Sequence, residues 1–271
     1  EPTLQKHLRE FPTFYKDNMY IPNGDDTVRL KLYIQNDWKW VTAKLKHTDM
    51  QYIRKHLQNA KMTVPTLEKR YHKYFLKFAF EEETNLKETQ DTILSVDLGA
   101  NTDAVCSVIK SDGTILSRKF INFQSDKDYL THTLNKIKGI CQHYGPHNTT
   151  KLWRKAKFKN TELARKIANA ITEYAEIQNV DVIVFEHLNF KGKSYGSKKQ
   201  KLHMWKKNSI QQLVANKAHR KGIKISHINA VNTSKIAFDG SGKLIRDKFN
   251  HKLATFSNGK KYNCDLSASY N

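Results

Sequence analysis

Alternating apolar and polar positions predict that the first 90 residues form mainly strands. Segments 27–34, 37–45 and 73–80 each alternate apolar with polar or basic side chains, which is the period-two pattern of half-buried strands. Residues 23–26, NGDD, are typical of a turn, and residues 64–73 are expected to turn into the last strand.

Several antiparallel strands with basic faces suggest that this first region is a small barrel or curled sheet. Trp38 and Trp40 alternate with charged or polar residues, and we expect them to lie in the barrel core. The charged stretch 81–91 is typical of a linker.

A second pattern begins at Ile93 and predicts a mixed α/β domain. Three short strands, two helices, a buried strand, a helix and a further strand are expected in turn; their segments are 93–99, 104–110, 114–121, 126–143, 161–178, 180–190, 207–221 and 223–231. Residues 111–114, SDGT, predict a hairpin between the second and third strands. This order indicates a mixed sheet flanked by helices, as in the RNase H-like arrangement. A polar, Gly-rich segment at 235–262 then precedes the start of a last helix, NCDLSASYN.

Three carboxylates stand in matching places in this second region. Asp97 ends its first strand, Glu186 ends the buried strand, and Asp265 opens the last helix. In an RNase H-like sheet the first and fourth strands are neighbours, so Asp97 and Glu186 should nearly touch, and a packed helix could bring Asp265 to them. Three uncompensated carboxylates repel one another, so the trio predicts a site for Mg²⁺ or Mn²⁺, which could cleave phosphodiesters. Alternatively, the two aspartates cap a turn and a helix.

Charge indicates a polyanionic partner. With 47 Lys and Arg against 26 Asp and Glu, the net charge is +21 and the pI about 9.7, which favours nucleic-acid binding. Two basic stretches with interleaved aromatics, 151–159 and 191–207, are the expected contacts. Their candidate residues are Trp153, Arg154, Lys191, Lys193, Tyr195, Lys198, Lys199 and Trp205.

Cysteine and histidine usage argues against a zinc site. Cys106, Cys141 and Cys264 are far apart, which fits packing residues in a reducing cytosol. His187 is next to Glu186 and could reach the acids, although a histidine at a strand end is usually polar surface. We find no stretch of about 20 apolar residues that would span a membrane, and the polar start without methionine suggests a fragment.

Four motifs resemble those of the transposon-encoded TnpB family, which is related to type V CRISPR effectors. They are SVDLGANTDAV, VIVFEHLNF, NTSK and CDLSASYN, and they cover residues 93–271 in the family's order. The resemblance implies an RNA-guided DNA endonuclease in which Asp97, Glu186 and Asp265 bind the catalytic Mg²⁺ or Mn²⁺. It also implies guide RNA and target DNA as partners, and the cytoplasm of a prokaryote, near the nucleoid, as the location.

By this resemblance, residues 1–90 are a wedge-like β-barrel domain and residues 91–271 a RuvC-like nuclease domain. The sequence departs from the family at 235–262, where a zinc ribbon is usual, because Ala237, Gly240, Ser257 and Asn258 stand near the expected cysteines. We therefore expect a zinc-less insertion there. Ser267 replaces the family's usual Asn, and the upstream recognition region is expected to be absent or short.

Two other function classes remain open. The same scaffold could be an RNA-guided DNA-binding protein without cleavage, for which loss of an acid would be the mark; all three acids are present. An actin-like or sugar-kinase ATPase also begins with Asp-x-Gly, and FDGSGK superficially suggests its second phosphate loop. However, that motif lies in an unpatterned stretch, and the high pI is unusual for such an enzyme.

Overall fold

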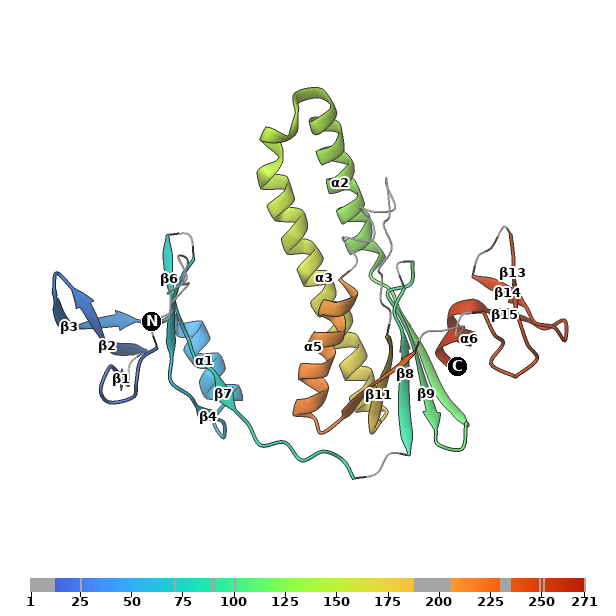
Figure 1. Ribbon diagram of the computed structural model, residues 1–271, viewed down its shortest axis with the longest axis horizontal. Coiled ribbons are helices and arrows are strands. Elements are labelled where there is room, and N and C mark those ends of the chain that lie inside the picture. Colours follow the sequence, from blue (N-terminus) through green and yellow to red (C-terminus); the bar gives the residue numbers. More distant parts are fainter. Residues whose placement is uncertain are drawn as a thin grey trace, which may run out of the picture. The chain divides into compact units, whose positions relative to one another are not determined.

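The chain folds into two compact units, Glu1–Glu83 and Thr84–Asn271, whose elements are labelled in Figure 1. The computed structural model describes residues 13–24, 26–70, 72–88, 91–99, 101–187, 206–229, 235–248, 250 and 252–270. Each unit has its own hydrophobic core.

An antiparallel sheet in the order β1-β2-β3 organises the first unit. Its strands are β1 (Tyr20–Asn23), β2 (Thr27–Ile34) and β3 (Asp37–Lys44). The alternation seen in the sequence is confirmed in β2, where Val28 and Leu30 are buried against Phe14. The expectation that the two tryptophans of β3 lie in a core is wrong. Their side chains belong to the opposite face of the sheet and are 52% and 37% exposed.

The rest of the first unit is a helix and two short ladders. Helix α1 (His47–His56) follows the sheet, β4 (Lys61–Met62) pairs with β7 (Phe80–Glu81), and β5 (Thr66–Arg70) pairs with β6 (Lys73–Lys77). The turn expected over 64–73 is wrong, since β5 occupies half of that segment and pairs with β6. The described strands form separate sheets and no closed barrel, so the barrel is not confirmed.

A five-stranded mixed sheet forms the centre of the second unit, in the order β10-β9-β8-β11-β12. Its strands are β8 (Thr92–Asp97), β9 (Ala104–Lys110), β10 (Ile115–Ile121), β11 (Val182–His187) and β12 (Lys224–Asn229). The first three are antiparallel neighbours, whereas β11 runs parallel to both β8 and β12. The predicted hairpin and the predicted pairing of the first and fourth strands are both confirmed. With its flanking helices, the sheet fits an RNase H-like fold.

Three helices cover one face of this sheet. They are α2 (Gln124–Tyr144), α3 (Thr150–Ile177) and α5 (Lys207–Arg220), and they lie on the same side in Figure 1. Their apolar stripes pack on Leu94, Val96 and Phe185 in the main core. A 3-10 turn, η1 (Pro146–Thr149), joins α2 to α3, which begins 11 residues before the predicted 161. None of the described helices is long and apolar enough to cross a membrane.

The last described segment forms a small lobe and a short helix. Strands β13 (Ile245–Arg246), β14 (Leu253–Thr255) and β15 (Lys261–Asn263) pair in an antiparallel sheet. Helix α6 (Cys264–Tyr270) follows without a break and packs on β8 and β9. In Figure 1 it lies across the sheet from α3 and α5.

Candidate functional site

Two of the three predicted acids lie on adjacent strands and on the same face of the mixed sheet. The parallel register pairs Phe185 of β11 with Val96 of β8, so the next positions along the strands are Glu186 and Asp97. Phe185 and Val96 face the helices. Because side chains alternate along a strand, Asp97 and Glu186 belong to the face that α6 covers.

The chain turns sharply directly after Asp97. A Cβ on Gly99 would be 2.6 Å from the carbonyl oxygen of Thr102, which is too close for any other residue without a shift of the backbone. Asp103 then stabilises this turn, since its buried carboxylate accepts a 2.6 Å hydrogen bond from the Phe123 amide. The glycine after the strand is therefore explained by the close approach of this turn.

Helix α6 brings the third acid to the same face. Its start is capped by the Asn263 side chain, which accepts a 3.0 Å hydrogen bond from the Leu266 amide. Its end is held by a buried 2.6 Å hydrogen bond between the hydroxyls of Ser269 and Ser107 of β9. Asp265, in the first turn of this anchored helix, interacts electrostatically with Asp97.

The gathering of acids changes the protonation of Asp97. Burial is the largest cause, followed by the charges of Glu186 and Asp265, and together they raise the pKa of Asp97 to about 7. The positive charges of Lys207 and Arg246 act in the opposite direction. Desolvation and the two neighbouring carboxylates together therefore outweigh the effect of the cations on the Asp97 pKa.

Lys207 is a site residue that the sequence analysis missed. It opens α5 with a side chain only 5% exposed, and its ammonium donates to the backbone carbonyl of Glu186 at 3.2 Å. Gln211, one turn later, donates to the same carbonyl at 3.2 Å. Burial lowers the pKa of Lys207, whereas Glu186 and Asp97 raise it. Its position as the last lysine of a basic run concealed this role in the sequence.

The donor chemistry of the site fits a hard divalent cation. Three carboxylates that repel one another are relieved by a charge of +2, and Mg²⁺ and Mn²⁺ prefer oxygen ligands. Within the described part of the chain, however, no group of three or more His, Cys, Asp or Glu side chains is placed to hold a metal ion. The acids therefore share an electrostatic environment, and direct coordination by all three remains a prediction.

The predicted nucleic-acid contacts divide into two groups. Trp153 and Arg154 lie in the first two turns of α3, and both side chains are exposed. The others lie outside the described residues; they are Lys191, Lys193, Tyr195, Lys198, Lys199 and Trp205. His187 is exposed at the end of β11, with its ring 6.5 Å from that of His227.

Aromatic packing organises the lobe at 235–262, where the sequence predicts a zinc-less insertion. The ring of Phe238 lies 5.8 Å from Phe256, 5.1 Å from Tyr262 and 5.0 Å from Tyr270. The two turns that contain Gly240 and Asn258 are joined by a 3.0 Å hydrogen bond from the Asn258 amide to Asp239. The other two positions considered for cysteine hold buried Ala237 and exposed Ser257.

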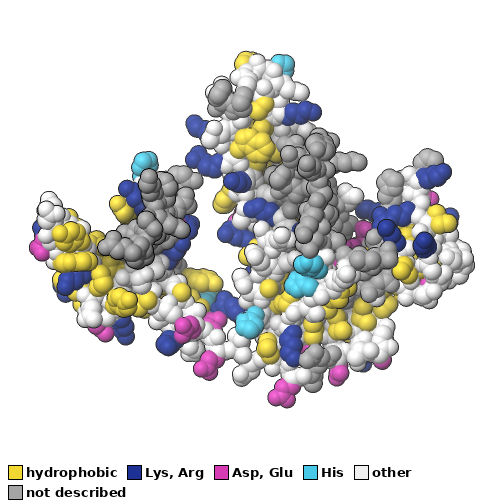
Figure 2. Space-filling view, viewed as in Figure 1, with side chains coloured by type: hydrophobic (Ala, Val, Ile, Leu, Met, Phe, Trp, Pro, Cys, Tyr) yellow, Lys and Arg dark blue, Asp and Glu magenta, His cyan; other side chains and the backbone are white. Residues whose placement is uncertain are grey.

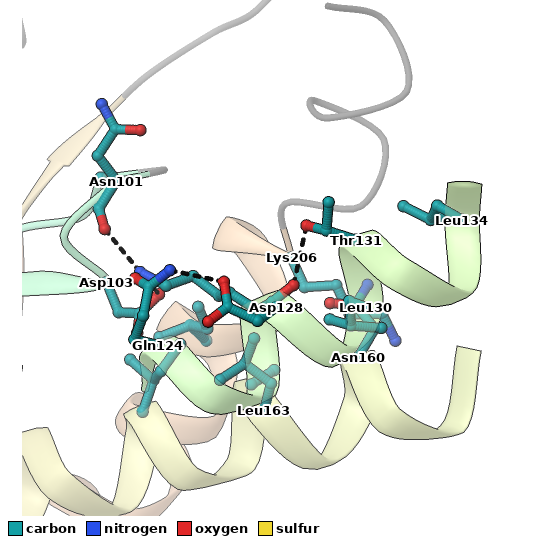
Figure 3. Close-up of a pocket in the computed structure, with 15 residues that line it drawn as sticks. Asn101, Asp103, Gln124, Asp128, Leu130, Thr131, Leu134, Asn160, Leu163 and Lys206 are labelled. Atoms are coloured by element: carbon teal, nitrogen blue, oxygen red, sulfur yellow. Dashed lines mark hydrogen bonds and ion pairs between the residues drawn. The ribbon is translucent and has the colours of Figure 1, made fainter. Parts of the chain in front are cut away.

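A cavity of about 290 Å³ opens beside the turn that follows Asp97. Lys127, which lines the cavity, donates to the backbone oxygen of Asn101 at 2.6 Å. Figure 3 shows the polar rim at Gln124, which donates to Asp128 at 2.8 Å. Leu130 and Leu163 belong to its apolar wall between α2 and α3. The cavity therefore lies at the same end of β8 as Asp97.

Comparison with solved structures shows the fold. The chain is 15% identical to a Cas12f1 in complex with sgRNA and target DNA (TM-score 0.53, 95% of this chain, 68% of that one). It is 13% identical to the mini-RNA-guided endonuclease CRISPR-Cas_phi3 (TM-score 0.56, 90% and 56%). It is 9% identical to C2c1 of Alicyclobacillus acidoterrestris in complex with single-guide RNA (TM-score 0.55, 98% and 55%).

These structural neighbours are type V effectors, and this chain spans between 55% and 68% of their lengths. No protein-family model matches the sequence, and no curated protein matches it.

Proposed function

We propose that this protein is an RNA-guided DNA endonuclease of the TnpB type that hydrolyses phosphodiester bonds at Asp97, Glu186 and Asp265. One observation carries the proposal: the half-buried Asp97 carboxyl, at the tip of the central strand, interacts with both other acids and has a pKa raised to about 7. Structural stability alone does not account for this cluster, because buried like charges oppose folding.

The chain's own residues have distinct tasks in this proposal. Asp97, Glu186 and Asp265 would hold Mg²⁺ or Mn²⁺, which supplies activation of water and stabilisation of the leaving oxygen. Lys207 would fix the end of β11 through its bond to the Glu186 carbonyl. The tight turn at Gly99 keeps Asp97 at the end of strand β8.

Guide RNA and target DNA are the partners that the charge supports. A net charge of +21 attracts polyanions along the whole chain, and base pairing between guide and target would supply the sequence specificity. We assign residues 1–90 to a wedge-like domain and residues 91–271 to the nuclease domain. The exposed Trp153 and Arg154 of α3, with the basic segment after Glu186, would contact the nucleic acid.

A second candidate is an RNA-guided DNA-binding protein that does not cleave. The observation that favours it is the absence, among the described residues, of three acids already placed to hold one ion. In that case Asp97, with a pKa of about 7, would be partly protonated at neutral pH, and the protein would bind its target without metal.

Cleavage of guide-matched DNA distinguishes the two functions. The protein, purified with its bound RNA, is incubated with matched and mismatched duplexes in Mg²⁺ and in EDTA, beside Asp97→Asn. Asp112→Asn is the matched control, because Asp112 lies in the exposed β9–β10 hairpin.

Mg²⁺-dependent cutting of the matched duplex that is lost in Asp97→Asn and kept in Asp112→Asn supports the nuclease. Guide-dependent binding without cutting supports the second candidate. Cutting that survives in Asp97→Asn contradicts the assignment of the site.

A further inference from the structure

The outer face of the β1-β2-β3 sheet carries an aromatic surface that the first unit leaves uncovered. The register pairs Tyr33 with Trp38 and Lys31 with Trp40, and paired residues share a face. The same face includes Arg29, whereas the alternate positions of β2 belong to the core. We call this side of the sheet the aromatic face.

Large rings are exposed on this face to an extent that core packing does not explain. Tyr33 is 60% exposed, Trp38 52% and Trp40 37%. Tyr33 and Trp38 lie with centroids 5.5 Å apart and planes tilted by 59°, so they support each other at the hairpin end. Figure 2 shows hydrophobic side chains exposed beside Lys and Arg on this unit. Exposed aromatic clusters of this kind mark interaction surfaces.

The charges on the same face are all positive. Alternation along the three described strands assigns Arg29, Lys31 and Lys44 to it, and assigns no Asp or Glu. The Arg29 guanidinium lies 5.1 Å from the centroid of the Trp40 ring, so a cation is already held against an aromatic plane. Rings that offer flat faces, with cations beside them, match a ligand made of bases and phosphates.

We propose that the aromatic face binds an unpaired stretch of nucleic acid, with bases stacked on Trp38 and Trp40 and phosphates at Arg29 and Lys31. An unpaired strand is favoured over a duplex, because a base can stack on a side chain only when its own face is free. A second copy of this chain is disfavoured, since two surfaces with three cations and no acid repel each other. The aromatic face belongs to the first unit and the acids belong to the second, so this proposal goes beyond the proposed cleavage reaction.

Binding of an oligonucleotide and of its abasic counterpart tests the proposal. The full chain is titrated, in EDTA, into a labelled oligothymidylate of about 12 nucleotides and into an abasic strand of equal length, with fluorescence anisotropy as the readout. EDTA removes any contribution of a divalent ion, so failure here and failure of the nuclease are separate outcomes. The variants are Trp38→Ala/Trp40→Ala and Trp38→Phe/Trp40→Phe, with Tyr52→Ala, a 54% exposed aromatic of α1, as the control.

We expect the double alanine variant to bind oligothymidylate at least about tenfold more weakly, since each lost base stack weakens binding by about tenfold. Its affinity for the abasic strand should be unchanged. The phenylalanine variant should recover most of the loss, and Tyr52→Ala should bind as the unmodified protein does.

Three results would overturn the proposal. They are unchanged oligothymidylate binding in the alanine variant, an equal loss for both strands, and no recovery with phenylalanine. A mass that rises with protein concentration and returns to the monomer value in the alanine variant would assign the face to self-association instead.

Discussion

Replacing Asp97 by Asn should stabilise the metal-free protein at neutral pH while removing its proposed activity. The carboxyl has an ordinary pKa of 3.8, which burial and the neighbouring acids raise to about 7. Each factor of ten in proton affinity corresponds to about 1.4 kcal/mol, so ionised Asp97 opposes folding by about 4 kcal/mol. Asn keeps the shape and the hydrogen-bonding capacity without the charge, and its amide can donate to a neighbouring carboxylate.

The sign of this effect fixes its pH dependence. Between the two pKa values the folded protein binds more protons than the unfolded chain, so its stability decreases as the pH rises from about 4 to about 7. Urea unfolding of the second unit in EDTA, followed by circular dichroism, should therefore give Asp97→Asn its full advantage near pH 8 and only a small one near about pH 4. Mg²⁺ at a hundred times its dissociation constant should stabilise the unmodified protein by about 2.7 kcal/mol. The Asp97→Asn variant should gain no such stability.

Asp126→Asn is the matched control of opposite sign. Asp126 is also buried, but it accepts hydrogen bonds from Lys159 at 2.5 Å and Lys166 at 2.8 Å, which lower its pKa. Its loss should destabilise the protein near pH 7. Equal stability of Asp97→Asn and the unmodified protein at pH 8, or an advantage independent of pH, would refute the electrostatic account of the site.

Three further predictions follow from other contacts. Lys207→Met should reduce guide-directed cleavage at least about tenfold, because the substitution removes the buried ammonium beside Glu186 and Asp97. Its effect on DNA binding should be smaller, and equal losses in the cleavage and binding assays would contradict this prediction. Phe238→Ala should lower the free energy of unfolding by about 1–3 kcal/mol, because it removes the ring that packs on Phe256 and Tyr262. EDTA should not change the stability of the unmodified protein, and thermal melts of the variant and of the EDTA-treated protein check the two expectations. Gly222→Ala should destabilise by more than about 1 kcal/mol in urea unfolding, since Gly222 has φ +72° and its Cβ would meet the Asn85 carbonyl at 2.4 Å.

The second unit was largely predictable because its patterns are local and strong. The run from Val182 to Phe185 is typical of a strand buried on both faces, and the i, i+3, i+4 pattern of α3 predicts its helical state. The start of α3 was placed too late, since its first turns carry a lysine-rich exposed surface that conceals the apolar stripe. The adjacency of Asp97 and Glu186 followed from strand order alone.

The first unit was harder to predict, because alternation does not reveal which face of a sheet is covered. Trp38 and Trp40 have the same period as core residues, yet the core lies under the opposite face. Helix α1 has no fully buried residue, and its short apolar stripe, Met50 and Ile53, is only half-buried. Lys207 was missed for a related reason, since nothing local distinguishes a buried lysine from its exposed neighbours in a basic run.

The anchoring of α6 on β8 and β9 also sets an order of events during synthesis. Asp97 precedes Asp265 by about 170 residues, so a ribosome working at about 5–20 residues per second delivers the third acid about 10 to 30 seconds after the first. During that interval the number of Lys and Arg in the nascent chain rises from 16 to all 47, while the chain still lacks the helix that brings Asp265 to Asp97. The positive charge is therefore complete before the acidic cluster, which forms only when the last strand and helix have docked.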